Sequence, residues 1–153
     1  MQTSIRNAVA ADALEVAEIH LAARREMTYL PVLHSDEETR SWMAGEVFAD
    51  CRVAVAEIGG AVVGFAALEG GRLEHLYVHP DFQSQGVGAL LLAWSLSASP
   101  GGVDLWVYQK NLRAIAFYRR HGFSVVRRTD GENEDREPDL LLAWSSASDT
   151  MSS

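Results

Sequence analysis

The chain has 153 residues, 48% of them hydrophobic and 22% charged, and carries a formal net charge of −8. These values are ordinary for a globular domain, and a chain of this length buries roughly two thirds of its unfolded surface. The sequence holds no run of about 18 apolar residues, which excludes a membrane-spanning helix, and its negative charge disfavours nucleic acids as partners.

The beginning of the chain and its cysteine content set further limits. The first residues lack the charged-then-apolar layout of a secretory signal. The single cysteine, Cys51, rules out an internal disulfide and lies in an apolar run typical of a buried strand. Both features fit a reducing, cytoplasmic location. We expect one domain over residues 1–145, followed by a frayed tail at residues 146–153.

The first half of the chain predicts one strand, two helices and three further strands. Asp12 and Glu15 stand in capping-box spacing, and Ser35 and Glu38 repeat that spacing after the helix-breaking Pro31. Gly-Gly pairs then separate short runs rich in Val and Ala, as tight turns between antiparallel strands do. The predicted strands are 3–9, 51–58, 61–69 and 72–78, and the predicted helices are 12–26 and 35–48.

The second half predicts two helices that alternate with strands. A Pro-Gly-Gly sequence ends the first helix and Gly122 ends the second. The segment "LLLAWS" occurs at 90–95 and 140–145. We assign the first copy to a helix and the second to a strand, because a glycine loop precedes one and Glu-Pro-Asp precedes the other. The predicted helices are 86–98 and 111–122, the strands are 103–108, 123–129 and 140–144, and a polar loop spans 130–139.

The resulting order of elements is β-α-α-β-β-β-α-β-α-β-β. Three strands joined by hairpins form an antiparallel half, and two strand–helix–strand units follow, for which right-handed crossovers are expected. The fold class is therefore α/β, a mixed sheet with helices on both faces.

The stretch "QSQGVGALLLAW" (83–94) places two glycines directly before a buried helix. The first turn of a helix offers unpaired N–H groups and the positive end of the helix dipole, which together bind anions. Gly86 and Gly88 would let an anion approach, and Gly86 can adopt φ > 0. The two glycines suit a tight strand-to-helix turn equally well. The dinucleotide fingerprint fails at Leu91, and no Walker sequence is present, which disfavours NAD and ATP.

The segment "LEHLYVHPDFQSQGVGALLL" (73–92) resembles the signature of the Gcn5-related N-acetyltransferases (GNAT). Their acetyl-CoA motif, Gln/Arg-x-x-Gly-x-Gly/Ala, stands here as residues 83–88, after a strand and a His79-Pro80 turn. The segment "NLRAIAFYRRHGF" (111–123) is similar to a second family segment, and the order of elements fits over nearly the whole chain. The resemblance implies a GNAT-like fold and acyl-CoA binding, but it does not identify the acceptor.

The resemblance also implies how the coenzyme binds. N–H groups from Gln85 to Ala89 would hold the diphosphate, and the strand at 76–78 would pair with the pantetheine arm in a gap beside the fifth strand. The amide of Val78 would face the thioester oxygen. Asn111 is a helix N-cap, a contact to the coenzyme arm, or both. The residues expected to bind the coenzyme are Leu76, Tyr77, Val78, Gln83, Gln85, Gly86, Val87, Gly88, Ala89 and Asn111.

Two residues are candidates for proton transfer. Tyr118 lies two helical turns after Asn111, and the resemblance implies that it protonates the departing thiolate. From the pattern alone, a tyrosine here would be core packing. Glu74 and His75 are adjacent on a strand, so we expect only one of them to face the acceptor. Glu74 is our first choice as base, although a solvated residue near the strand start is at least as good an interpretation.

The acceptor side carries weaker signals. The loop between the first two helices lines this side in the family, so Tyr29 and His34 are expected to bind the acceptor, with His34 as a further base candidate. His75, on the strand at 72–78, is expected to bind the acceptor as well. The loop 130–139 holds six acids and one arginine. We favour a solvated hairpin tip over a negative rim that attracts a cationic amine.

We therefore predict an enzyme that transfers the acetyl group of acetyl-CoA directly to a primary amine of a small molecule or peptide. Tyr118 would be the general acid, and the base would act through water. The alternative is a non-catalytic acyl-CoA-binding sensor or docking module. Four tryptophans on different elements allow a homodimer contact. No His/Cys/Asp cluster has metal-ligand spacing, so no metal is expected.

Overall fold

A computed structural model of the protein describes residues 2–146, so most of the tail predicted to fray (146–153) lies outside the described residues. The order of elements is the predicted one, except that a π-helical turn interrupts the second predicted helix (35–48). The strands are β1 (Thr3–Asn7), β2 (Arg52–Ile58), β3 (Ala61–Glu69), β4 (Arg72–Val78), β5 (Val103–Tyr108), β6 (Ser124–Arg128) and β7 (Asp139–Trp144). The helices are α1 (Ala13–Arg25), α2 (Asp36–Trp42), α3 (Phe48–Asp50), α4 (Val87–Ala98) and α5 (Leu112–Arg120), with a π-helical turn between α2 and α3.

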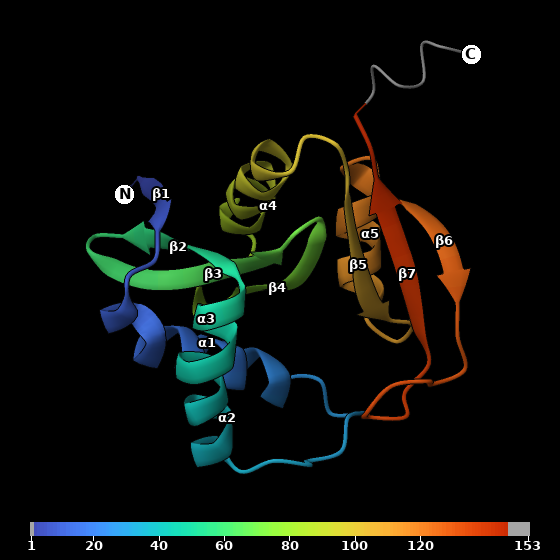
Figure 1. Cartoon of the computed structure of the whole chain (residues 1–153), viewed down its shortest axis with the longest axis horizontal. Coiled ribbons are helices and arrows are strands. Elements are labelled where there is room, and N and C mark those ends of the chain that lie inside the picture. Colours follow the sequence, from blue (N-terminus) through green and yellow to red (C-terminus); the bar gives the residue numbers. More distant parts are fainter. Residues whose placement is uncertain (1, 147–153) are drawn as a thin grey trace.

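The seven strands form one sheet in the order β1-β2-β3-β4-β5-β7-β6. All neighbours are antiparallel except β4 and β5, which run parallel and pair only where Arg72 faces Asp104. The side chains of these two residues also form an ion pair. Beyond that point the strands diverge, and Figure 1 shows the β2–β4 half and the β5–β7 half standing apart. The sheet is thus split into two halves that meet at one end of β4.

Helices cover both faces of the β2–β4 half (Figure 1). On one face, α4 buries Leu91 and Leu92 against the sheet, and on the other α1 buries Val16 and its neighbours. Gly64 of β3 lets α4 lie close, because a Cβ there would come within 3.1 Å of the Leu91 side chain. The third helical layer, α5, packs on the β5–β7 half through Tyr118. This arrangement leaves the start of α4 beside the split. Within the described residues, no helix is long and apolar enough to cross a membrane.

The two predicted capping boxes had different outcomes. Ser35 and Glu38 form theirs, with Ser35 N donating to the Glu38 carboxylate (2.7 Å) and Glu38 N donating to Ser35 Oγ (3.0 Å). The prediction for Asp12 was wrong. Its carboxylate accepts from the Arg6 guanidinium (2.8 and 2.9 Å) and from Val9 N (2.7 Å). A contact with Arg6, six residues earlier, and a bond to Val9 N therefore replace the predicted cap on the helix.

Two other local predictions concern Cys51 and the repeated "LLLAWS". Cys51 lies just before β2 rather than inside it and is half-buried, and burial raises the pKa of its thiol to about 11. The thiol therefore stays protonated at neutral pH. The first "LLLAWS" lies in α4 and the second in β7, as predicted.

Candidate active site

The split between β4 and β5 begins at a β-bulge. The pairing of β4 with β3 shifts between Leu73 and His75, which leaves Glu74 as an extra residue on β4. A bulge bends its strand and increases the local twist. β4 therefore turns away from β5 two residues past Arg72, the position where the two strands still pair.

Hydrogen bonding between β3 and β4 decides which backbone groups face the split. His79 N donates to Val63 O (2.8 Å), and along an antiparallel pair the N–H groups point alternately toward and away from the partner strand. The N–H groups of Leu76 and Val78 therefore point away from β3. The carbonyl of Val78 does so too, since it accepts from Gln83 Nε2 (3.3 Å). β4 thus presents a backbone edge to the gap.

The glycine loop ends beside this gap. Gly86 has a φ of 81°, the predicted left-handed conformation, and α4 begins at the next residue, Val87. A Cβ on Gly86 would meet no atom within 4 Å, and one on Gly88 would touch the Phe117 ring at 3.6 Å. The space beside the Cα of Gly86 is therefore open, directly before the first-turn N–H groups of α4, which have no partners within the helix. A helix start of this kind is a candidate anion site.

Arg113 of α5 reaches this loop, a contact that the sequence did not predict. Its guanidinium donates to Gln83 Oε1 (2.8 Å) and to Ser84 Oγ (2.9 Å). Ser84 has a φ of 67°, which is uncommon for a residue other than glycine. No local pattern could reveal this contact, because the residues it joins are 30 positions apart in the chain.

A cavity of about 80 Å³ lies in the gap, and it brings together residues predicted from distant segments. Leu76 and Tyr77 of β4 border it on one side, and Asn111 and Tyr118 on the other. Asn111 Oδ1 accepts from Ala114 N (3.2 Å), which confirms the N-cap; its contact to the coenzyme stays a prediction. Tyr118 is buried, and burial raises the pKa of its phenol, so it remains protonated at neutral pH.

A second cavity, of about 1100 Å³, has an aromatic floor. His75 of β4 and His20 of α1 meet edge to face with ring centroids 5.4 Å apart, and Trp42 and Tyr77 pack around them. The Nδ1 atoms of both histidines are buried and have no hydrogen-bond partner in the described part of the chain. Burial lowers the pKa of His20 to about 4 and that of His75 to about 3, so both rings are neutral at pH 7.

The expectation that only one of Glu74 and His75 faces the acceptor side was wrong. Both border the large cavity. Strict alternation fails because Glu74 is the bulge residue. Desolvation raises the pKa of the Glu74 carboxyl, and Arg72 partly opposes that shift. A carboxylate with a raised pKa accepts a proton more readily than an imidazole with a pKa of about 3, so Glu74 is the better base candidate.

The other two predicted acceptor residues differ in position. His34 borders the large cavity, with its Nε2 3.0 Å from Glu134 Oε2. Tyr29 lies one layer behind the wall, since its ring packs against Tyr108, which does border the cavity, and the Lys110 ammonium group lies over the Tyr29 ring. His34 can therefore meet an acceptor directly, whereas Tyr29 supports the wall.

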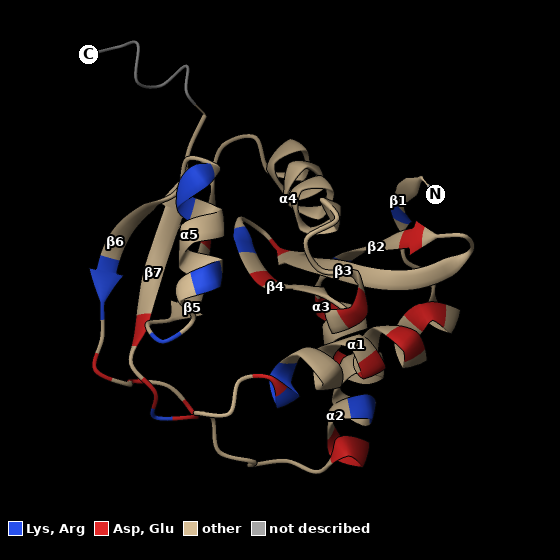
Figure 2. Ribbon diagram, turned by 180° about the vertical axis from the view of Figure 1, so that it is seen from behind, with Lys and Arg blue, Asp and Glu red and all other residues tan. Residues whose placement is uncertain are grey.

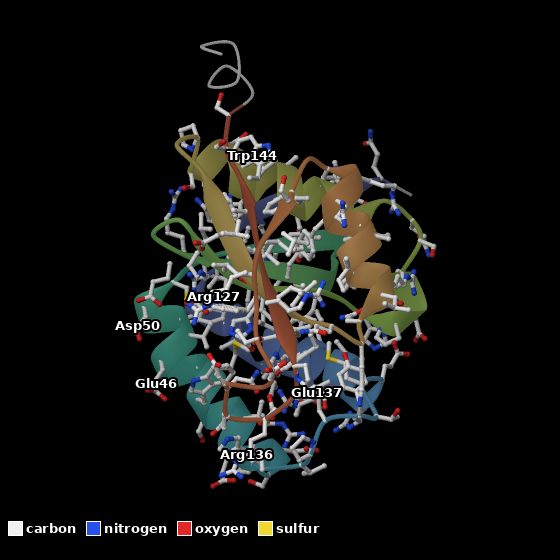
Figure 3. All side chains as sticks on the ribbon, turned by 90° about the vertical axis from the view of Figure 1, so that its right-hand side faces the viewer. Glu46, Asp50, Arg127, Arg136, Glu137 and Trp144 are labelled. Carbon is white, nitrogen blue, oxygen red and sulfur yellow. The ribbon has the colours of Figure 1, made fainter. Side chains whose placement is uncertain are left out.

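The acidic loop 130–139 is not solvated throughout, contrary to the favoured interpretation. Asp135 accepts from Arg24 of α1 (2.5 Å), and its side chain is only 7% exposed. Glu137 and Asp139 are buried as well. Figure 3 shows Glu137 at the base of β7 and Arg136 at the outer edge. The loop ties the β5–β7 half of the sheet to α1 across the large cavity.

The large cavity is strongly acidic. Figure 2 shows acidic residues along α1 to α3 and the 130–139 loop, whereas basic residues mark α5. The bordering carboxylates are those of Asp36, Glu38, Glu46, Glu74, Glu132, Glu134 and Asp139. The bordering guanidinium groups, Arg24 and Arg25, are both held in ion pairs. The cavity therefore attracts cations. Among residues 2–146, no group of three His, Cys, Asp or Glu side chains is placed to hold a metal ion.

Comparison with known proteins identifies the family. The family model described as "Acetyltransferase (GNAT) domain" matches residues 49–125. The chain belongs to this family. The matched range runs from the end of α3 into β6 and so includes the bulge, the glycine loop, Asn111 and Tyr118, but neither α1 nor the acidic loop. The match therefore covers the gap and the small cavity better than the walls of the large one.

Two relatives and one further structure place the family match in context. The peptidyl-lysine N-acetyltransferase YjaB of Escherichia coli is 33% identical over 79 residues, 52% of this chain and 53% of YjaB. The apo solution structure of YjaB aligns over 96% of this chain and 100% of that one, at 26% identity and a TM-score of 0.79. A mycothiol acetyltransferase from Parafrankia is 42% identical over 77 residues, 48% of this chain and 24% of that protein. The structure of yncA from Salmonella typhimurium with acetyl-CoA shares the fold. It aligns over 95% of this chain and 94% of that one, at 21% identity and a TM-score of 0.74.

The sequence matches thus span about half of YjaB and about a quarter of the mycothiol enzyme. Proteins whose names give different acceptors match this chain, so the matches alone do not fix its acceptor.

Proposed function

We propose that the protein transfers the acetyl group of acetyl-CoA directly to a primary amine. The observation that carries this proposal is the split sheet: β4 and β5 pair at one position only, and beyond it the N–H groups of Leu76 and Val78 face a gap that leads to the start of α4. In acetyl-CoA an extended thioester arm continues into a diphosphate, so the arm would lie along the gap and the diphosphate would lie at the start of α4. The open space before Gly86 gives the diphosphate room to reach the helix.

The residues around the gap have distinct chemical tasks. Acetyl-CoA supplies an activated acetyl group as a thioester. The N–H of Val78 would stabilise the negative charge that develops on the thioester oxygen. Tyr118, held protonated by burial, would donate its proton to the leaving thiolate. The same poorly solvated surroundings make that thiolate a stronger base than it is in water.

The attacking amine needs a proton acceptor, because an amine with a pKa near 10 is mostly protonated at neutral pH. Glu74 would take that proton through water, since it borders the large cavity at the bulge where the strands part. The neutral pair His20 and His75 adds no positive charge that would repel the incoming ammonium group.

The acceptor we propose is the side chain of a lysine in a peptide. At about 1100 Å³ the large cavity is slightly larger than the usual small-molecule site, which measures roughly 300–1,000 Å³. Its excess of carboxylates suits a cationic segment. YjaB, which aligns along nearly the whole chain, carries the name of a peptidyl-lysine enzyme.

A panel of amines tests this function. Release of CoA thiol is measured with lysine peptides that have basic, neutral or acidic neighbours, and with spermidine and free lysine as small amines. We expect the fastest release with the basic peptides, and an acetyl adduct on the lysine side chain by mass spectrometry. Acetyl-CoA binding without thiol release for any amine would instead identify a non-catalytic binding module. Fastest release with a small amine would contradict the peptide acceptor alone.

A further inference from the structure

The glycine loop lacks a cation of its own. Residues 79–90 contain no Lys or Arg, and the protein as a whole has a net charge of −8. A diphosphate is an anion, and the backbone N–H groups of a helix start contribute only partial charges. A protein with this overall charge repels such a ligand unless a full positive charge lies close to the binding groups.

Arg113 is placed to supply that charge. It lies on the first turn of α5, and its side chain crosses to the loop, where it donates to Gln83 and Ser84. A guanidinium has five N–H donors in a planar fork, and these two bonds use two of them. Because Arg113 is exposed, the remaining donors are open to a ligand.

The same contacts shape the loop. Gln83 joins Arg113 to the carbonyl of Val78, at the end of the strand whose edge faces the gap. Ser84 is held in a left-handed conformation directly before Gln85 and Gly86. Arg113 thus connects α5, the glycine loop and the end of β4. All three elements surround the path from the small cavity to α4.

We propose that Arg113 binds the diphosphate of the coenzyme and, through Gln83 and Ser84, holds the glycine loop in its binding conformation. This inference rests on the proposed function. Arg113 takes no part in proton transfer, so its loss should weaken coenzyme binding and leave the chemical step unchanged. Hydrogen bonds to charged groups are stronger than neutral ones, and losing one costs about tenfold to a hundredfold in affinity.

Arg113→Met tests the proposal, since it keeps most of the side-chain length and removes the charge. Calorimetry gives the Kd for CoA and for 3′-dephospho-CoA, and kinetics give kcat/KM for acetyl-CoA and for S-acetylpantetheine, which lacks every phosphate. We expect at least a tenfold rise in both Kd values, with kcat/KM for S-acetylpantetheine changed less than twofold. Arg113→Lys should recover part of the loss.

Arg120→Met is the matched control, because Arg120 is an exposed arginine in the last turn of the same helix. Arg120→Met should leave the two Kd values and the two kcat/KM values unchanged. An equal loss for acetyl-CoA and S-acetylpantetheine would show that Arg113 supports the fold and not the diphosphate. A loss with CoA but not with 3′-dephospho-CoA would move the contact to the 3′-phosphate and overturn the assignment. Unchanged affinity would overturn it entirely.

The test stays separate from the proposed function. Calorimetry on the wild type reports coenzyme binding whether or not any amine is acetylated. Failure of the wild type to bind CoA would remove the proposed function itself, whereas normal wild-type binding with unaltered Arg113→Met binding removes only the role of Arg113.

Discussion

The two sides of the candidate active site are built in different ways. On the coenzyme side, the groups that face the gap are mostly backbone: the N–H groups of β4 past the bulge and those of the first turn of α4. On the acceptor side they are side chains: two neutral histidines on the floor, and acids from α2 and the 130–139 loop around it.

This difference explains why one side can be read from sequence and the other cannot. Backbone geometry is set by few residues, such as a glycine with φ > 0 or a strand that leaves its partner, and these recur at fixed spacing. A side-chain wall depends on which residues many separate segments bring together. The family match follows the same division, since it ends before the acidic loop and begins after α1.

The strongest test of the backbone-built side is Gly86→Val. A β-branched residue is a conformational outlier at the φ of 81° found here, so the loop must move. Calorimetry should show no measurable CoA binding, while circular dichroism shows a folded protein. The control is Gly45→Val, because a Cβ at Gly45 also meets nothing within 4 Å but its φ needs no glycine. CoA binding by Gly86→Val at wild-type affinity would refute the proposed diphosphate site at the start of α4.

Tyr118→Phe separates catalysis from binding on the same side. The ring still fills its place between Phe117 and Phe123, so the core is kept. Loss of a general acid lowers rates by about 10² to 10⁴. We expect kcat to fall about a hundredfold with the Kd for acetyl-CoA unchanged. A parallel loss of both would mean that Tyr118 only positions the coenzyme.

The sequence predicted the fold closely because local and global signals agree in this chain. Every strand and helix was placed, including the two copies of "LLLAWS", whose flanking residues favour different structures. Two errors share one cause. Asp135 pairs with Arg24, and Arg113 reaches Gln83, and each contact joins segments far apart in the chain that no local pattern connects.

The bulge at Glu74 illustrates the same limit within one strand. Alternation is a sound rule for a regular strand, and it assigned Glu74 and His75 to opposite faces. One extra residue on β4 cancels that rule. His20 was not predicted as a site residue, although the sequence contained a signal for its burial. Its neighbours Ile19 and Leu21 are apolar residues of α1 that are buried, and they marked this helix as core-facing.

The histidine floor makes the acceptor side sensitive to acid. An unfolded histidine binds a proton below a pKa near 6.5, whereas folded His20 and His75 resist protonation down to about pH 4 and 3. The free energy of unfolding is therefore highest above pH 6.5 and falls as the pH drops below that value. Between pH 6.5 and 5, each of the two rings should lower the free energy of unfolding by about 2 kcal/mol.

Urea unfolding at pH 7.5 and pH 5 measures this loss, and His75→Phe should reduce it by about half. Phenylalanine fits the aromatic cluster and does not titrate. His121→Gln is the control, since His121 is exposed and its replacement should leave the pH dependence unchanged. If His75→Phe also leaves it unchanged, the floor is hydrated, and the low pKa of the pair is wrong.

Glu74→Gln carries the smallest expected effect, and it bears on both sides because Glu74 lies where they meet. A base that acts through water is partly replaced by bulk solvent, so we expect kcat/KM to fall only about tenfold. The dependence of activity on pH is the more discriminating measurement. Activity should decline at low pH as the raised pKa of the Glu74 carboxyl is crossed, and the variant should lose that acid limb. Glu46→Gln, another carboxylate on the same cavity, should retain it. An acid limb in Glu74→Gln as steep as in Glu46→Gln would assign the base to another residue and leave the bulge with a purely structural task, that of opening the sheet.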